Sequence, residues 1–464
     1  MAENEYDLII LGGGAAAFAG ALKASEIDAK VSMIEHGVIG GTCVNVGCVP
    51  SKNLLGVGET IYECLNGKLD EGLRGSINFD FRKIIQDKDN LVLSLRNQKY
   101  ADVLGSMRNT EFILGNARFR SKNEIEANGK ILRAKNILIA TGSSAMVPPI
   151  KGIESVDYLT NIEALSLEDR PESMIIIGGR TLGLEFAQMY SRLGTKVTLL
   201  QRSYKIIPEE EPEISDALKS YLEEEGIEIH TGVKIESVRS DDEEKVVLAS
   251  GFEFRAKKLL IATGRKPNTV DLGLENAGVA VSESGMVIVD DEMRTNVPNI
   301  FAAGDVIGEP MLETVAAKEG SIAASNALFG TNKKMDFSAV PHAVFTSPQV
   351  ASVGITEKEQ MKKYGRCSCK TLLMKDVPKA IIVNKTKGLI KMVVDPKTQQ
   401  ILGVHILSDL AADIIHEATL AVKNKMTVDD IVDTVHVFPT MSESIKLVAT
   451  SFKKNLKMLS CCVE

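Results

Sequence analysis

Two cysteines, Cys43 and Cys48, lie in a glycine-rich stretch that reads Gly-Gly-Thr-Cys-Val-Asn-Val-Gly-Cys-Val-Pro-Ser-Lys over residues 40–52. On a continuous helix they would be separated by about 7.5 Å along the axis, whereas disulfide-bonded residues usually have Cα atoms roughly 4.4–6.8 Å apart. We therefore expect the segment to begin in an irregular turn, which glycine permits. A helix starting near Pro50 would lower the pKa of a neighbouring thiol. The pair predicts redox or metal chemistry, with two buried structural cysteines as the alternative.

A predicted strand, turn and helix precede the cysteines. The apolar run Tyr6–Leu11 leads into Gly12, Gly14 and Ala17, and a second strand over 29–34 ends at Glu35. Small residues at this turn let the backbone approach a pyrophosphate at the start of the helix, and an acid after the second strand can accept hydrogen bonds from a ribose. The pattern predicts a dinucleotide site directly before the thiols.

The same pattern recurs in the middle of the chain. Gly178 and Gly183 follow a strand over 173–177, but the acid position after the strand over 196–200 holds Gln201, with Arg202 next and Lys205 close behind. Loss of a carboxylate and gain of cations favour a 2′-phosphate, and hence NADP rather than NAD. Solvated surface charges are the alternative interpretation of the two cations.

Both predicted folds close with a strand and a turn, at Thr141-Gly142 and at Thr263-Gly264. A further strand within 295–305 ends at Asp305, whose carboxylate would suit the ribityl hydroxyls of a flavin. Gly41 and Thr42, beside the first cysteine, are expected to contact the same cofactor. One nucleotide per fold would let electrons pass from nicotinamide to flavin to sulfur.

Length and charge narrow the class of protein. The chain has 464 residues and a net charge of -8, which argues against a nucleic-acid or anionic-membrane partner. An acidic N-terminus without an apolar spanning run predicts a cytoplasmic protein. The fold class is predicted as α/β, with two Rossmann-like nucleotide-binding domains and a C-terminal α+β interface domain. The expected domains are a first nucleotide domain over 1–150 and 270–340, a second nucleotide domain over 151–269 and an interface domain over 341–464.

The motif from Cys43 to Lys52 resembles that of the pyridine nucleotide-disulfide oxidoreductases, and the likeness extends over nearly the whole chain. The resemblance implies FAD in the first domain, NADPH in the second and dimerisation through the third, in a homodimer whose active site is completed by the C-terminal domain of the partner. It also implies that Cys43 exchanges with substrate and Cys48 touches the flavin. Lys52 and Glu185 correspond to the charge pair beside the flavin ring.

The C-terminal region indicates which substrate is used. Phe438 stands where disulfide-reducing members carry a histidine base, and phenylalanine cannot move a proton. His436, two residues earlier, is interpreted as structural. The tail ends in Cys461 and Cys462, whose neighbouring Cα atoms lie about 3.8 Å apart, so a disulfide would be strained while a soft cation would bind readily. This tail resembles that of mercury(II)-reducing members of the family.

The resulting expectation is a relay of mercury between thiols. Cys461 and Cys462 of one subunit would collect Hg(II) as a thiol complex and pass it to Cys43 and Cys48 of the other, where it would be reduced to Hg(0). The alternatives are a disulfide reductase similar to thioredoxin reductase or dihydrolipoamide dehydrogenase, and a metal-sequestering protein without enzymatic activity.

Several positions depart from the family pattern or fit none. Arg180 replaces the second glycine of the NADPH turn and would crowd or instead contact the coenzyme phosphates, and Thr181 replaces a tyrosine that often gates the nicotinamide. Cys64 has no assigned role. Cys367 and Cys369 are expected to be surface thiols, with extra metal ligands as the less favoured interpretation.

Overall fold

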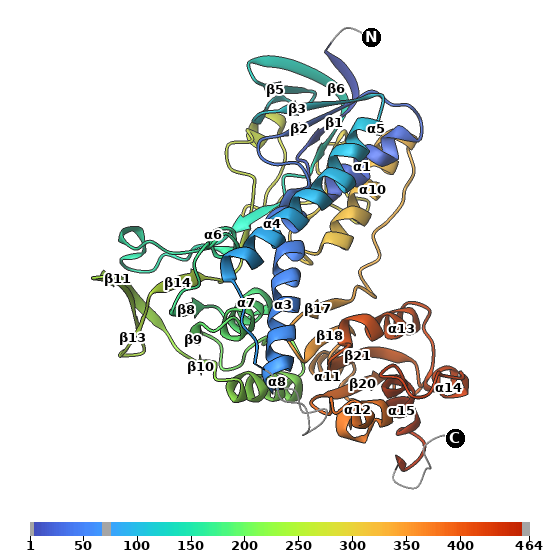
Figure 1. The fold of residues 1–464 in the computed structure, drawn as a ribbon. Helices are drawn as coiled ribbons and strands as arrows, with labels where there is room; N and C mark the ends of the chain where they lie inside the picture. The colour runs from blue at the N-terminus through green and yellow to red at the C-terminus, as the bar shows by residue number, and fades with distance from the viewer. Residues whose placement is uncertain (1–3, 67–75, 457–464) are drawn as a thin grey trace. The chain divides into compact units, whose positions relative to one another are not determined.

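The computed structural model describes residues 4–66 and 76–456 (Figure 1). The chain divides into two compact units. The first contains residues 1–51, 85–147 and 264–336, and the second contains residues 52–84, 148–263 and 337–464. The α/β fold class is confirmed. The finer division into three domains stays a prediction.

The first unit is organised around a seven-stranded sheet with the order β3-β2-β1-β6-β5-β4, in which β16 also pairs with β6. Strands β3, β2, β1, β6 and β16 run parallel, while β4 and β5 form an antiparallel extension. The strands are β1 (Glu5–Leu11), β2 (Val31–Glu35), β3 (Thr110–Leu114), β4 (Ala117–Ser121), β5 (Glu124–Ala127), β6 (Lys130–Ile139) and β16 (Ile300–Ala302).

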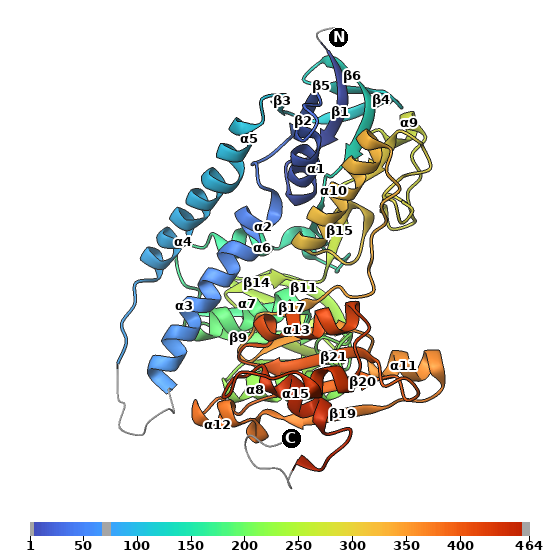
Figure 2. The ribbon, with the colours of Figure 1, turned by 90° about the vertical axis from the view of Figure 1, so that its right-hand side faces the viewer.

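The C-terminal half of β1, near the middle of this sheet, is apolar because both of its faces are covered. Leu8, Ile9, Ile10 and Leu11 of β1 are all fully buried, as expected of a parallel strand between helices. Helices α1 (Ala15–Ser25) and α10 (Glu313–Phe329) contribute to one apolar core beside it and lie side by side (Figure 2). The expected first strand, turn and helix are therefore confirmed.

Two segments of this unit connect the sheet to the cysteine region and to its own edges. Strands β3 and β4, which Gly115 and Asn116 separate in the chain, lie at opposite edges of the sheet. Helix α4 (Phe81–Arg96) continues through a wider π-helical turn over Asn97–Ala101 into α5 (Asp102–Ser106).

The second unit contains the repeat of the nucleotide fold. Its four-stranded parallel sheet has the order β10-β9-β8-β14, and an antiparallel meander β11-β12-β13 follows β10 in the chain. The elements are β8 (Ser173–Ile177), α7 (Thr181–Arg192), β9 (Lys196–Gln201), α8 (Pro212–Glu224), β10 (Glu228–Thr231), β11 (Ile235–Asp241), β12 (Glu244–Ala249), β13 (Phe252–Ala256) and β14 (Lys258–Ile261).

The C-terminal part of this unit is a five-stranded antiparallel sheet with the order β17-β18-β21-β20-β19. Apart from α11, its strands and helices contribute to one apolar core. They are β17 (His342–Val344), β18 (Gln349–Gly354), α11 (Glu357–Tyr364), β19 (Cys369–Leu373), α12 (Pro378–Ile382), β20 (Leu389–Val394), β21 (Ile401–Ser408), α13 (Ala411–Lys423), α14 (Val428–Asp433) and α15 (Glu443–Thr450). Within residues 4–66 and 76–456, no helix has the length and apolar character needed to cross a membrane.

Candidate active site

The cysteine segment folds as two helices with a break between the thiols. Cys43 lies in the short helix α2 (Gly41–Val46), and Cys48 is the first residue of α3 (Cys48–Asn66). The prediction that no continuous helix joins the two cysteines is confirmed: Gly40 and Gly41 open the segment with positive φ, and a further break follows at Gly47. Gly47 has φ -132 and ψ -117, and a Cβ there would lie 2.9 Å from the Thr42 carbonyl oxygen.

The two thiols interact across this break. Contact with Cys48, together with burial and the neighbouring Glu313 carboxyl, raises the pKa of the Cys43 thiol. The Cys43 thiol lies inside the short helix α2, with a second sulfur and a carboxyl near it. The thiol at a helix start, for which the sequence predicts a lowered pKa, is Cys48.

Side chains from distant parts of the first unit hold the segment in place. Asn45 donates to the carbonyls of Ile39 (3.0 Å) and Gly41 (2.8 Å), and Arg96 of α4 donates to the Asn45 side-chain oxygen at 2.7 Å. The Tyr100 hydroxyl donates to Glu313 Oε1 at 3.2 Å. These contacts tie the thiol segment to α4 and α10.

Glu313 and Tyr100 are candidate functional residues that the sequence did not reveal. Burial raises the pKa of Glu313, the first residue of α10, which interacts with the Cys43 thiol. Burial and the nearby Glu313 carboxyl also raise the pKa of Tyr100. No motif or spacing connects either residue with Cys43, because only the fold brings the three segments together.

The first glycine turn fits the FAD that the sequence predicts. Gly12 has φ +122, and a Cβ there would lie 2.2 Å from the Ala140 carbonyl oxygen. Gly14 precedes α1 without any side-chain cap, so the first backbone N–H groups of the helix can bind a pyrophosphate. Ala17 is fully buried against the sheet, and Glu35 lies at the end of β2, where its Oε1 accepts from Gly37 N at 2.6 Å.

The Gly41 backbone comes close to this turn. A Cβ on Gly41, which has φ +66, would lie 2.7 Å from Gly14 Cα, so the cysteine segment starts beside the pyrophosphate position. Thr42 follows as an exposed residue. This proximity agrees with the prediction that both residues contact the flavin nucleotide.

The carboxyl end of the sheet carries a second group of predicted flavin contacts. Asp305 follows β16, and its Oδ2 accepts from Ser143 Oγ at 2.5 Å and lies 3.6 Å from Arg265 Nε. Thr141 Oγ1 donates to the Asn268 carbonyl at 2.8 Å, while Gly142 has φ +68. These side chains place a carboxylate and hydroxyls where the ribityl hydroxyls of FAD could bind.

The second glycine turn repeats the first and fits NADPH. Gly178 has φ +119, and Gly183 packs so closely that a Cβ would lie 1.8 Å from the Gly178 carbonyl oxygen. Arg180 occupies the N-cap position of α7 without a side-chain cap hydrogen bond, and its exposed side chain has Nε 3.7 Å from Glu209. Its contact with the coenzyme phosphates stays a prediction. Gly264 has φ +127, and its carbonyl oxygen accepts a hydrogen bond from Met146 N at 2.9 Å.

Polar groups at the end of β9 occupy the positions from which NADP was predicted. The buried Gln201 side chain accepts from Gly179 N at 3.1 Å. Arg202 is exposed, and none of the described acids pairs with it. Lys205 instead binds Asp216 at 2.5 Å. Of the two expected cations, Arg202 is therefore the one available for a 2′-phosphate.

Lys52 and Glu185 form the predicted charge pair. Lys52 Nζ lies 2.7 Å from Glu185 Oε2, and the Glu185 side chain is only 4% exposed. The second carboxylate oxygen accepts from Phe345 N at 2.9 Å, and the Lys52 ammonium lies 4.7 Å from the centre of the Phe345 ring. Helices α3 and α7 and the loop after β17 thus hold this pair together.

The segment before α15 supports the structural interpretation of His436. Its Nε2 lies 2.7 Å from Glu417 Oε1, and its Nδ1 is 3.0 Å from the Thr434 carbonyl oxygen. Phe438 is exposed. The predicted ligands Cys461 and Cys462 lie outside the described residues.

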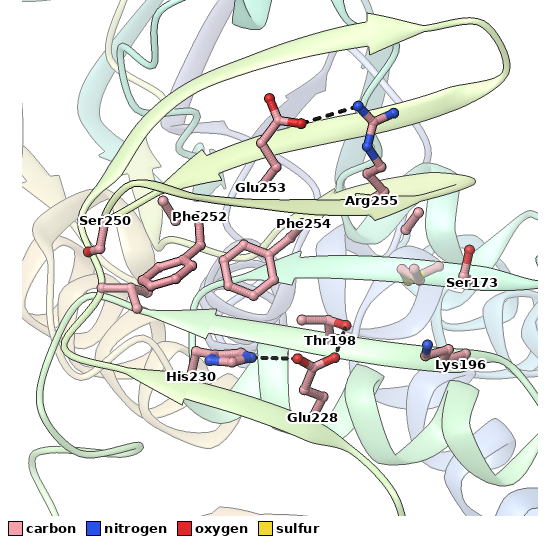
Figure 3. Close-up of a pocket in the computed structure, with 14 residues that line it drawn as sticks. Ser173, Lys196, Thr198, Glu228, His230, Ser250, Phe252, Glu253, Phe254 and Arg255 are labelled. Atoms are coloured by element: carbon pink, nitrogen blue, oxygen red, sulfur yellow. Dashed lines mark hydrogen bonds and ion pairs between the residues drawn. The ribbon is translucent and has the colours of Figure 1, made fainter.

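A cavity of about 590 Å³ lies between the four-stranded sheet and the meander of the second unit (Figure 3). The rings of His230 and Phe254, with centres 4.7 Å apart, line it together with Phe252. His230 pairs with Glu228 at 2.6 Å. None of the predicted site residues lines this cavity, so its size does not mark it as the reaction site.

Comparison with known proteins agrees with this geometry. Residues 6–320 match the family described as pyridine nucleotide-disulphide oxidoreductase, and residues 340–449 match the dimerisation domain of that family. The chain belongs to the pyridine nucleotide-disulphide oxidoreductases. The resemblance predicted from the cysteine motif is thereby confirmed.

Several similar oxidoreductases carry the name mercuric reductase. The protein from Lysinibacillus sphaericus is 43% identical over 465 residues, which cover 99% of this chain and 85% of the relative. The protein from Streptomyces lividans is 41% identical over 471 residues, covering 99% of both. Among solved structures, the HOCl-induced flavoprotein disulfide reductase RclA from Escherichia coli is similar, with a TM-score of 0.88, 30% identity and coverage of 97% of this chain and 100% of that one.

Proposed function

We propose that this oxidoreductase reduces Hg(II) to Hg(0) with electrons from NADPH, using FAD and the thiols of Cys43 and Cys48. The observation that carries the proposal is the contact between these two thiols across the Gly47 break, in the segment beside the first nucleotide turn. The naming of relatives 36% to 43% identical as mercuric reductase supports the choice of substrate.

The residues divide the task between binding nucleotides and binding the metal. When bound, NADPH supplies a hydride and FAD passes its two electrons onward. Gly12, Gly14 and Glu35 hold the flavin nucleotide, while Gly178, Gly183 and the polar pair Gln201 and Arg202 hold NADPH. Cys43 and Cys48 bind Hg(II) as thiolates, which soft cations prefer.

Proton movements follow from the surroundings of Cys43. Binding Hg(II) displaces the protons of both thiols, and the Glu313 carboxylate, which contacts the Cys43 thiol, can accept one of them. Hg(II) then gains two electrons and leaves as Hg(0), while both sulfurs remain thiolates. This reaction requires no general base at Phe438, unlike reduction of a disulfide.

The C-terminal thiols are assigned to metal delivery. Cys461 and Cys462 collect Hg(II) as a thiol complex and transfer it by thiolate exchange to Cys43 and Cys48 of the partner subunit in a homodimer. The match of residues 340–449 to the dimerisation domain supports such a dimer. We place the enzyme in the cytoplasm, where a reducing environment keeps thiols available.

The test measures NADPH oxidation and trapped Hg(0) vapour together, with Hg(II) supplied in excess low-molecular-weight thiol. We expect oxidation to depend on Hg(II) and to match the vapour released. Separate assays offer glutathione disulfide, lipoamide, thioredoxin and Cu(II), the last because one similar structure is titled a Cu(II) complex. The assignment would be rejected if the assay with Hg(II) released no Hg(0) while a disulfide or Cu(II) was turned over in its own assay.

Matched serine variants identify the thiols involved. Cys43→Ser and Cys48→Ser should each abolish mercury turnover, whereas Cys64→Ser, which changes an exposed thiol on α3, should leave it unchanged. The Cys461→Ala/Cys462→Ala variant should lose turnover of Hg(II) bound to bulky thiols but keep NADPH-dependent flavin reduction. Unchanged mercury turnover in that variant would refute the delivery step.

A further inference from the structure

A second group of sulfur and oxygen ligands lies in the C-terminal part of the second unit. One ligand atom from each of Glu357, Cys367 and Cys369 can be chosen so that all three lie within 4.8 Å of one another. Glu357 is the first residue of α11, Cys367 lies in the loop after it, and Cys369 begins β19. All three side chains are at least partly accessible.

Local hydrogen bonds hold these three side chains together. Thr356 and Glu359 form a reciprocal cap at the start of α11, and Gly365 ends the helix with φ +68. The fully buried Gln360 donates to the Val394 carbonyl at 2.8 Å and accepts from Ser368 N at 3.2 Å. The loop that carries both cysteines is thus anchored to α11 and β20.

The charged side chains around the three ligands carry more negative than positive charge. Lys391, with a side chain 3% exposed, lies 2.6 Å from Glu357 Oε2, 2.9 Å from Glu211 and 3.0 Å from Glu213. One ammonium therefore faces three carboxylates. The other oxygen of Glu357 accepts from Cys367 Sγ at 3.2 Å, so a metal replacing that thiol proton would meet both ligands.

The two thiols lie in negatively charged surroundings. Burial and the Glu357 carboxylate raise the pKa of Cys369 to about 12, and a hydrogen bond to Glu357 raises that of Cys367. The same negative surroundings that disfavour a thiolate favour a divalent cation beside it. Cation binding here exchanges two protons for two metal–sulfur bonds and moves no electrons.

We propose that Glu357, Cys367 and Cys369 form a binding site for a thiophilic divalent cation, separate from Cys43 and Cys48. Two thiolates and one carboxylate suit cations such as Zn(II) or Cd(II), with a fourth position open to water. Cys367 is exposed and Cys369 is partly exposed, as expected of surface thiols, and this assignment gives both a ligand role. The proposal does not depend on mercury reduction, since it concerns binding alone.

The test titrates the reduced holoenzyme with Cd(II) and follows the thiolate-to-metal absorption band at equilibrium. Compared with the unaltered protein, Cys367→Ser/Cys369→Ser should bind one equivalent fewer per chain. Glu357→Gln should weaken that equivalent about tenfold or more. Cys64→Ser removes an exposed, isolated thiol as the matched control and should bind the same number as the unaltered protein.

Flavin content and NADPH-dependent flavin reduction check that the variants are folded. Equal Cd(II) stoichiometry in the unaltered protein and the double serine variant would overturn the proposal. Loss of an equivalent in Cys64→Ser as well would also overturn it, because the signal would then come from single surface thiols. Mercury turnover in the double serine variant distinguishes the two proposals, since it should continue there and fail in Cys43→Ser.

Discussion

Lys52 neutralises a carboxylate that has almost no contact with water. Glu185 is buried, and its two oxygens bind Lys52 and the Phe345 backbone. Removing one partner of a buried ion pair leaves an uncompensated charge, which costs more than the pair itself contributes. The stability effect of this pair can therefore be separated from any role in electron transfer.

We predict that Lys52→Met lowers the free energy of unfolding by about 2 kcal/mol, less than for a fully buried pair because Lys52 is partly exposed. Adding Glu185→Gln should recover most of the loss, since glutamine still accepts from Phe345 N and carries no charge. Denaturant unfolding with saturating FAD measures both variants. A double variant as unstable as Lys52→Met would show that packing, rather than the unpaired charge, is responsible.

Arg202 is the residue expected to give the enzyme its preference for NADPH over NADH. Since no described acid occupies its guanidinium, Arg202→Ala should raise the KM for NADPH by about 10- to 100-fold, the effect of losing one charged hydrogen bond. The KM for NADH should change little. Lys205→Ala is the matched control and should have a smaller effect, because Lys205 already binds Asp216. Equal changes for both coenzymes would exclude recognition of the 2′-phosphate.

At the scale of elements, the break between α2 and α3 decides whether the thiols meet. Gly47→Ala should shift this break, because the added Cβ would crowd the Thr42 carbonyl and the Cys43 backbone. We expect lower mercury turnover and slower oxidation of the thiol pair, measured by thiol titration. Gly56→Ala, on the exposed face of α3 with no atom near the new Cβ, should instead be neutral or stabilising by up to about 1 kcal/mol.

Helix α10 contains a buried acid, Glu319, that should make the folding stability depend on pH. Burial raises the pKa of Glu319 from 4.5 to about 7, and its Oε2 accepts from Gly304 N at 2.8 Å. The folded chain therefore keeps a proton that the unfolded chain releases, so folding stability falls as pH rises from 4.5 to about 7. The loss is at most about 3 kcal/mol and is complete above that range.

Replacing Glu319 with glutamine should remove this pH dependence. The Tm of flavin-free Glu319→Gln should exceed that of the unaltered protein by an amount that grows between pH 4.5 and about 7. Glu163→Gln is the control, because hydrogen bonds from Thr160 outweigh burial and hold the pKa of Glu163 below its usual value of 4.5. This variant should lower the Tm by an amount that is constant across this range and shrinks only below pH 4.5. A constant Tm difference for Glu319→Gln across this range would contradict the prediction.

For the whole molecule, the proposed site needs two chains. The unaltered protein should have twice the chain mass of 50.2 kDa in light-scattering measurements. Hybrid dimers of Cys43→Ser/Cys48→Ser chains with Cys461→Ala/Cys462→Ala chains should regain about half of normal mercury turnover, because one site then has all four thiols. Inactive hybrids would show that each tail serves its own chain.

The sequence by itself determined the nucleotide folds and the family. Glycine turns after buried strands are local features, since backbone approach and helix starts depend on neighbouring residues. For that reason Gly12, Gly178 and the motif around Cys43 and Cys48 could be interpreted from spacing alone. The pairing of Lys52 with Glu185 was also anticipated, but only through the family resemblance.

Tertiary structure alone decided what surrounds the thiols. Glu313 and Tyr100 contact the cysteine segment from distant parts of the chain, and the exact position of the helix break, at Gly47, was set by the fold. Likewise, Glu357 joins Cys367 and Cys369 only because α11 is followed by a loop that returns to it. Electrostatic environment and ligand geometry depend on distances through space, which residue spacing along the chain does not specify.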